Sequence, residues 1–181
     1  MGEVIEFKSK RSFRNIALIG FMGTGKSTVG KKLARLLNWE FLDTDLEIER
    51  LCEMSVTEIF QKFGEKRFRS EETLLVKRLS DYNQFVIATG GGLVVDPENW
   101  RNLEKNALII CLYAPLDKLS ERVGESSQRP LFKGKREDIE ALWQGRQAVY
   151  AKADVTVDTT FKDADEVVDA IMEELNIRKL I

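Results

Sequence analysis

Short apolar runs alternate with longer amphipathic segments along the chain. The apolar runs predict buried strands at residues 15–20, 40–43, 85–89, 107–113 and 154–158. Apolar positions that recur every three or four residues predict helices at residues 26–37, 45–51, 56–63, 65–79, 97–103, 115–123, 137–152 and 163–175. Strands that alternate with helices in this way form a mainly parallel sheet with right-handed crossovers, covered by helices on both faces.

Polar residues and glycines mark the start of two helices and the ends of three strands. Ser55 precedes one predicted helix and Asp96, followed by a proline, precedes another, so both side chains are expected to cap the first turn. Gly20, Asp43 and Gly90 fall at the carboxyl ends of predicted strands. Ligands of open parallel sheets gather at that edge, so we expect the functional site there.

Composition sets limits on the class of protein. A chain of 181 residues with 43% hydrophobic residues is long enough for one packed domain, and we expect residues 1–181 to form it. The net charge of −2 and the isoelectric point near 5.5 give no general attraction to nucleic acid or to an anionic membrane. The longest apolar run, residues 107–114, is far shorter than the ~20 residues of a membrane helix. We therefore expect a monomeric cytoplasmic protein with neither nucleic acid nor a membrane as a partner.

The segment at residues 20–28 carries the strongest chemical signal. It reads Gly-Phe-Met-Gly-Thr-Gly-Lys-Ser-Thr, between the apolar run at 16–19 and a predicted helix. In this Walker A pattern, glycines let successive backbone N–H groups and the positive end of the helix surround a phosphate. Lys26 adds a full positive charge, and the hydroxyl of Ser27 suits Mg²⁺. The alternative is a glycine-rich turn without function, but the flanking strand and helix favour a nucleoside triphosphate with Mg²⁺.

Two other strand ends carry polar or glycine-rich sequences. Asp43 and Asp45 are separated by one residue, so Asp43 is expected to face Mg²⁺ near Ser27 while Asp45 turns toward an acceptor hydroxyl. The alternative for Asp45 is a cap of the following helix. Residues 90–92 are all glycine. They form either a structural turn or a close approach to ligand, with an exposed amide at Gly91 that contacts a polar substrate.

The chain has no histidine, and its only cysteines are Cys52 and Cys111. Two cysteines are too few for a disulfide scaffold, and Cys111, inside an apolar strand, is expected to be an inert core thiol. Without histidine, any proton acceptor must be a carboxylate, a water or another weak base. Phosphoryl transfer tolerates this limit, because its loose transition state needs positioning and charge neutralisation more than a strong base.

Several arginines gain meaning only in combination. Arg69 and Glu72, three residues apart on a charged helix, form by themselves an ordinary surface pair. If the substrate carries a carboxylate, Arg69 and Arg146 are suited to bind it, because planar guanidinium groups match carboxylate geometry. Residues 124–136 lack apolar periodicity and are rich in positive charge. They are either a solvated connection or a mobile lid that brings Arg129 to the transferred group.

Taken in order, these motifs resemble the shikimate kinase family over roughly residues 15–159. The set consists of Gly-x-x-x-x-Gly-Lys-Ser at 20–27, Asp-x-Asp at 43–45, Phe-Arg-x-x-Glu at 68–72, Thr-Gly-Gly-Gly at 89–92, Arg-Pro-Leu at 129–131 and Arg-x-x-x-Tyr at 146–150. The resemblance implies a P-loop NTPase fold of the nucleoside-monophosphate-kinase type, with a five-stranded parallel sheet. It also implies transfer of the γ-phosphate of ATP to the 3-hydroxyl of shikimate, a step toward chorismate and the aromatic amino acids.

The resemblance further implies a role for each motif. Catalysis would depend on Lys26, Asp45 and Arg129. ATP would be bound by Gly23, Thr24, Gly25, Lys26, Ser27, Thr28, Arg122 and Arg129. Shikimate would be bound by Asp45, Arg69, Gly90, Gly91, Gly92 and Arg146. Mg²⁺ would be held by Ser27 and, through water, by Asp43.

The sequence departs from the family pattern on the side of the nucleotide base. Many relatives place an arginine after the Val-Asp-Thr strand, whereas this chain has Thr160-Phe161-Lys162 there. Two other functions stay open: a P-loop kinase for another small metabolite such as gluconate, and a non-catalytic ATP-binding module. The second alternative predicts the loss of Lys26, Asp45 or Arg129, and all three are present.

Overall fold

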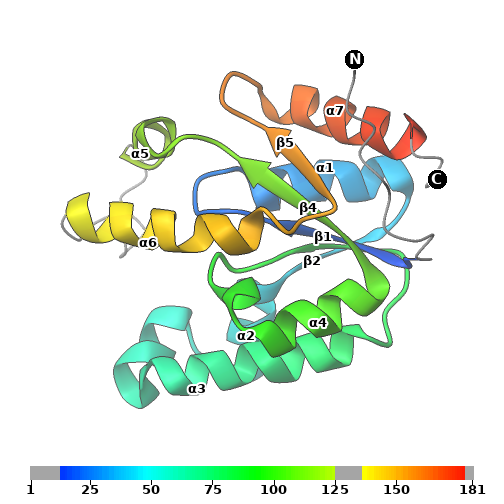
Figure 1. Cartoon of the computed structure of the whole chain (residues 1–181). Coiled ribbons are helices and arrows are strands. Elements are labelled where there is room, and N and C mark those ends of the chain that lie inside the picture. The colour runs from blue at the N-terminus through cyan, green and yellow to red at the C-terminus, as the bar shows by residue number, and fades with distance from the viewer. Residues whose placement is uncertain (1–12, 125–135, 178–181) are drawn as a thin grey trace.

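The computed structural model describes residues 13–124 and 136–177. At its centre a five-stranded sheet has the order β2-β3-β1-β4-β5, and every neighbouring pair of strands is parallel (Figure 1). The strands are β1 (Asn15–Ile19), β2 (Glu40–Asp43), β3 (Phe85–Ala88), β4 (Ala107–Tyr113) and β5 (Val155–Asp158). The predicted fold class is confirmed, and each strand begins and ends within one residue of its predicted bounds.

Helices cover both faces of the sheet (Figure 1). They are α1 (Lys26–Leu37), α2 (Thr44–Cys52), α3 (Val56–Leu79), α4 (Pro97–Asn106), α5 (Leu116–Gly124), α6 (Arg136–Tyr150) and α7 (Ala164–Ile177). Alternation along β1 assigns the faces, since Ile16 and Leu18 pack with α1 and α7, whereas Ala17 and Ile19 pack with α3, α4 and α6. None of the described helices has the length and apolar composition that crossing a bilayer requires.

Two differences from the predicted elements have simple causes. The two helices predicted at 56–63 and 65–79 form one assigned helix, α3. Gly64 inside it has φ 77° and ψ 173°, so the predicted interruption is present as a non-helical residue. The 3₁₀-helix η1 (Leu93–Val95) was not predicted, because three residues are too few to show a helical period.

Both predicted helix caps are confirmed. The hydroxyl of Ser55 accepts a hydrogen bond from the Glu58 N–H at 3.2 Å, and the Glu58 carboxylate accepts one from the Ser55 N–H at 2.8 Å. This reciprocal capping box fixes the start of α3. The Asp96 carboxylate accepts from the Glu98 N–H at 2.7 Å, and Pro97 occupies the first position of α4.

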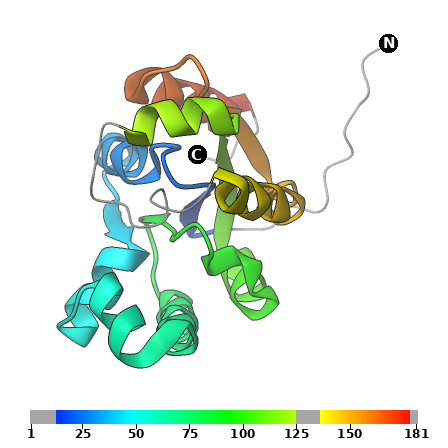
Figure 2. The same ribbon diagram turned by 90° about the vertical axis from the view of Figure 1, so that its left-hand side faces the viewer.

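The carboxyl ends of the strands meet at one edge of the sheet. The register pairs Asp43 with Ala88 across β2 and β3, and Leu18 with Ala88 across β1 and β3. Gly20, Asp43 and Gly90 therefore lie together at this edge, as predicted. Figure 2 looks onto it, and α2, α3, α5 and α6 stand around the loop between β1 and α1.

Replacing either of two helical glycines by alanine is expected to change the stability, in opposite directions at the two positions. A Cβ on Gly30 in α1 would lie 2.6 Å from a ring carbon of Phe41 and 3.3 Å from a methyl carbon of Leu18. We expect Gly30→Ala to lower the free energy of unfolding by ~1–3 kcal/mol, because overpacking outweighs the better helix propensity of alanine. A Cβ on Gly145 in α6 has no neighbour within 4 Å, so Gly145→Ala should raise that free energy by up to ~1 kcal/mol.

Chemical denaturation of the two variants and the unsubstituted protein measures both changes. A Gly30→Ala variant as stable as the unsubstituted protein would contradict the close packing of α1 on the sheet.

Candidate active site

The loop between β1 and α1 folds back on itself around the side chain of Lys26. Its ammonium group donates hydrogen bonds to the carbonyl oxygens of Gly20 and Phe21 at 2.8 and 2.9 Å, and the Thr24 hydroxyl donates to Phe21 O at 2.8 Å. Gly20 has φ 138°, and a Cβ there would lie 2.3 Å from the carbonyl oxygen of Leu112 in β4. Only glycine fits, so the loop is wound tightly at the N-terminus of α1, where a phosphate binds best.

Ser27 and Asp43 form a pair of hard oxygen ligands beside this loop. The Ser27 hydroxyl donates to one carboxylate oxygen of Asp43 at 2.6 Å. No group of three metal-binding His, Cys, Asp or Glu side chains occurs in residues 13–124 and 136–177. A site with one or two protein oxygens fits Mg²⁺, which usually keeps several waters and binds phosphate oxygens as well.

Asp43, and not Asp45, caps α2. The second carboxylate oxygen of Asp43 accepts from the N–H groups of Asp45 and Leu46 at 3.1 and 3.4 Å. The alternative interpretation of Asp45 as the cap is therefore wrong, because β2 ends at Asp43 and α2 begins at the next residue. The side chain of Asp45 is left free to serve the site.

The Asp45 carboxylate points at the glycine turn after β3. Its Oδ1 atom is buried and accepts no hydrogen bond within the described part of the chain. A Cβ on Gly90 would lie 2.4 Å from this oxygen, so the missing side chain makes the room for it. Burial is the main reason that the pKa of Asp45 is raised above its ordinary value, and the nearby Asp43 carboxylate raises it further. The Oδ1 atom of Asp45 is thus a buried acceptor for which the described residues supply no donor.

Glu72 joins Asp45 at the same turn. Its side chain is 1% exposed, one carboxylate oxygen accepts from Arg69 at 2.7 Å, and the other is buried without a partner among the described residues. That second oxygen would lie 3.3 Å from a Cβ on Gly90. Burial raises the pKa of Glu72 to about 7, even though Arg69 lowers it. The prediction that Arg69 and Glu72 form an ordinary surface pair is therefore wrong for Glu72, which is buried.

Two guanidinium groups converge on the next two glycines. The Nη1 and Nη2 atoms of Arg69, from α3, would lie 2.8 and 2.9 Å from a Cβ on Gly92. Nη1 of Arg146, from α6, would lie 3.0 Å from a Cβ on Gly91. The side chain of Arg146 is buried and its Cζ lies 5.5 Å from the centre of the Phe21 ring, which holds the guanidinium plane in place. The arrangement can bind a carboxylate between two planar cations.

Arg122 lies at the end of β5, on the side of the phosphate-binding loop opposite to the glycine turn at residues 90–92. From α5 it donates hydrogen bonds to the hydroxyl of Thr159 and to the carbonyl of Thr160, both at 3.1 Å, and also to the carbonyl of Thr159. These contacts bring α5 to the carboxyl end of β5. Phe161 follows with a side chain that is 88% exposed.

Comparison with known proteins identifies the family. The family model described as Shikimate kinase matches residues 22–176. The shikimate kinases of Desulforudis audaxviator and Pelotomaculum thermopropionicum are 48% and 46% identical to this chain, over 91% and 90% of its length and 88% and 95% of theirs. A solved shikimate kinase from Acinetobacter baumannii, in complex with shikimate, is 34% identical with a TM-score of 0.87, and the match covers 94% of this chain and 97% of that chain. The chain belongs to the shikimate kinase family.

Most of the residues that the resemblance to shikimate kinases singled out are brought together by the fold. The phosphate-binding loop, Asp43, Asp45, the turn at residues 90–92, Arg69 and Arg146 lie at one edge of the sheet. The predicted catalytic residue Arg129 lies outside the described residues. So does all of the predicted lid at 124–136 except its two end residues, where α5 ends and α6 begins.

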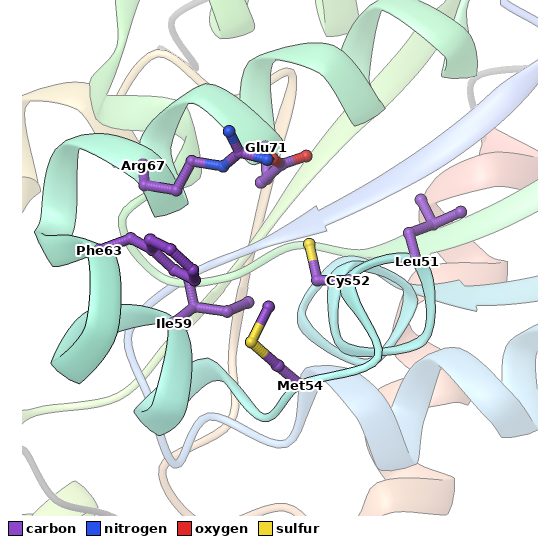
Figure 3. A pocket seen from close by; sticks show the side chains of 7 residues that line it. All are labelled: Leu51, Cys52, Met54, Ile59, Phe63, Arg67 and Glu71. Carbon is purple, nitrogen blue, oxygen red and sulfur yellow. The ribbon is translucent and has the colours of Figure 1, made fainter.

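A separate cavity of about 380 Å³ lies between α2 and α3 (Figure 3). Its lining is mostly apolar, with Cys52 in the wall and the ion pair of Arg67 and Glu71, 2.6 Å apart, at one side. None of the site residues expected from the shikimate kinase pattern lines it. The other cysteine, Cys111, is buried in β4 as predicted, and burial raises the pKa of its thiol to about 11.

Sequence reasoning left two polar residues without an assigned function, Glu72 and Tyr150. Both stand in the motifs that resemble shikimate kinases, but only as the last residue beside a more conspicuous arginine. Glu72 is 1% exposed, and it lies four residues after Phe68 and three before Leu75, so helical spacing could have indicated that it shares their buried face. Tyr150 is 4% exposed, and position i−4 before it is Arg146, so spacing gives no such signal.

The buried carboxyl group of Glu72 predicts a dependence of stability on pH. Because its pKa is about 7 in the folded protein and near 4.5 in the unfolded chain, the folded state binds more protons between these values. The associated stabilisation is complete below pH 4.5 and is lost as the pH rises through 7. Chemical denaturation at several pH values from 5 to 8 should show the unsubstituted protein losing stability relative to Glu72→Gln.

Glu65→Gln is the matched control, because Glu65 also binds Arg69, at 2.9 Å, but is exposed. A stability difference between Glu72→Gln and the unsubstituted protein that stays constant over this pH range would refute the predicted proton uptake.

Proposed function

We propose that this protein transfers the γ-phosphate of ATP to the 3-hydroxyl of shikimate, giving shikimate 3-phosphate and ADP on the route to chorismate and the aromatic amino acids. One observation carries the proposal. The guanidinium groups of Arg69 and Arg146 converge on a glycine turn beside the unpartnered oxygen of Asp45, next to a phosphate-binding loop. A hydroxylated carboxylic acid fits these groups, and family membership supports shikimate as that acid.

The phosphates are bound by the loop between β1 and α1. Lys26 supplies a full charge to the β- and γ-phosphates, and the N–H groups that the N-terminus of α1 leaves without helical partners point at phosphate oxygens. The residues proposed for nucleotide binding are Gly23, Thr24, Gly25, Lys26, Ser27, Thr28, Arg122 and Arg129. Mg²⁺, held by Ser27 and through water by Asp43, neutralises negative charge on the phosphates when it is bound.

The order of the strands supports an in-line reaction. Groups for the acceptor stand at the ends of β2 and β3, the phosphate-binding loop follows β1, and Arg122 stands beyond β4 at the end of β5. The acceptor hydroxyl and the nucleoside therefore approach the loop from opposite sides. Attacking and leaving oxygens must lie on opposite sides of the transferred phosphorus, so this separation is what phosphoryl transfer requires.

Asp45 orients the acceptor hydroxyl and takes its proton. Its buried Oδ1 atom lacks a donor within the described residues, so a substrate hydroxyl would satisfy it. Burial raises the pKa of Asp45, which makes the carboxylate a better proton acceptor than an exposed one. We also propose that residues 1–181 form one kinase domain, that residues 124–136 act as its lid, and that Arg129 neutralises charge in the transition state.

A substrate panel tests the proposed activity directly. With ATP and Mg²⁺, the protein should release ADP in the presence of shikimate and show no comparable turnover with gluconate or AMP, as measured in a coupled ADP-release assay. Turnover with gluconate and none with shikimate would instead favour the other small-metabolite kinase. Binding of ATP without turnover of any acceptor would favour the non-catalytic ATP-binding module.

Replacing Arg146 by lysine tests the carboxylate clamp. Arg146→Lys keeps the charge but loses the planar pair of donors, so we expect the KM for shikimate to rise ~10-fold or more while the KM for ATP is unchanged. Steady-state kinetics with each substrate varied in turn measures both constants. Arg50→Lys is the control, because Arg50 is exposed and paired with Glu47 at 2.7 Å. An unchanged KM for shikimate would mean that Arg146 does not bind the acid.

A further inference from the structure

The hydroxyl group of Tyr150 makes a specific contact with the glycine turn. Tyr150 lies one helical turn after Arg146 on α6, its side chain is 4% exposed, and its hydroxyl donates a hydrogen bond to the carbonyl oxygen of Gly91 at 2.7 Å. The ring packs in the apolar cluster that also contains Phe21 and Ile19. The ring therefore serves the core, while the hydroxyl reaches the site.

This hydrogen bond sets the orientation of one peptide group. The peptide between Gly91 and Gly92 is trans, so its C=O and N–H groups point in opposite directions. With the carbonyl oxygen held by Tyr150, the Gly92 N–H points away from that hydroxyl. The guanidinium group of Arg69 lies beside the same residue, since its Nη1 atom would be 2.8 Å from a Cβ on Gly92. A peptide between two glycines rotates easily, because neither residue has a Cβ to restrict it.

The same hydroxyl also lies beside Arg146. The charge of that guanidinium and a hydrogen bond with it lower the pKa of Tyr150, but burial outweighs both and raises the pKa to about 12. The phenol therefore keeps its proton at the pH of any ordinary assay. It remains a donor to the Gly91 carbonyl throughout, so the peptide orientation does not change with pH.

We propose that Tyr150 is a positioning residue for the carboxylate of the substrate. Its hydroxyl fixes the Gly91–Gly92 peptide, so that the Gly92 N–H becomes a third donor in the space between the guanidinium groups of Arg69 and Arg146. The inference rests on the proposed function, because it needs an acceptor that carries a carboxylate. Tyr150 thus helps to select that acceptor through the peptide it orients, and does not contact the acceptor itself.

Tyr150→Phe tests this inference, because it removes the hydroxyl and keeps the ring in the core. We expect the KM and the calorimetric Kd for shikimate to rise about 3- to 10-fold, the effect of losing one hydrogen bond. The KM for ATP and kcat should stay the same. Tyr82→Phe is the control, since Tyr82 packs against Phe85, 4.7 Å between ring centres, in a different apolar cluster.

Two results with the Tyr150→Phe variant would overturn the inference. One is an unchanged shikimate KM and Kd in Tyr150→Phe, and the other is an equal rise in the constants for both substrates together with a lower melting temperature. The unsubstituted protein supplies an independent measurement, because shikimate should shift the amide resonance of Gly92 and slow its hydrogen exchange. A Gly92 resonance unmoved at saturating shikimate would also overturn it. Failure of the unsubstituted protein to bind shikimate at all would instead contradict the proposed function.

Discussion

The site depends on how closely charged side chains approach a stretch of backbone that has no side chains of its own. Asp45 from α2, Glu72 and Arg69 from α3, and Arg146 from α6 all reach the glycines at residues 90–92. Each of these groups lies within 3.3 Å of a place where a Cβ would stand in any other residue. Glycine has the most backbone freedom in the unfolded chain, so ordering three of them lowers the stability of the folded protein. What the glycines allow is a compact site in which two carboxyl groups and two guanidinium groups surround one turn.

The charges in this site are balanced only in part. Arg69 pairs with Glu72 and with the exposed Glu65, whereas Asp45 keeps a buried oxygen that no described residue satisfies. Burying an unsatisfied carboxylate oxygen is unfavourable, and the raised pKa of Asp45 and Glu72 expresses that penalty. In the proposed function, the hydroxyl of a bound acid would donate to Asp45 and its carboxylate would pair with the arginines, which would offset that penalty.

How far the sequence predicted this arrangement depends on whether a feature is local. The phosphate-binding loop and the caps at Ser55 and Asp96 were predicted correctly, because each is encoded within a few consecutive residues. The cap of α2 was harder, because β2 runs into α2 without a loop and shifts the cap from Asp45 to Asp43. The position of Glu72 at the site could not be predicted from its own helix, because it depends on how α3 packs beside the turn that follows β3.

The strand order explains how residues far apart in the sequence meet at one edge of the sheet. The chain goes from β1 outward to β2, returns through β3, and then crosses to β4 and β5 on the other side of β1. A crevice opens where the connections from neighbouring strands diverge, and in parallel sheets ligands bind there. Residues that follow β2 and β3 lie on one side of the loop after β1, and the end of β5, which α5 contacts, lies on the other. α5, with Arg122, and α6, with Arg146 and Tyr150, are consecutive helices that reach opposite sides of this crevice. The two helices between β4 and β5 thus contact strand ends on both sides of β1.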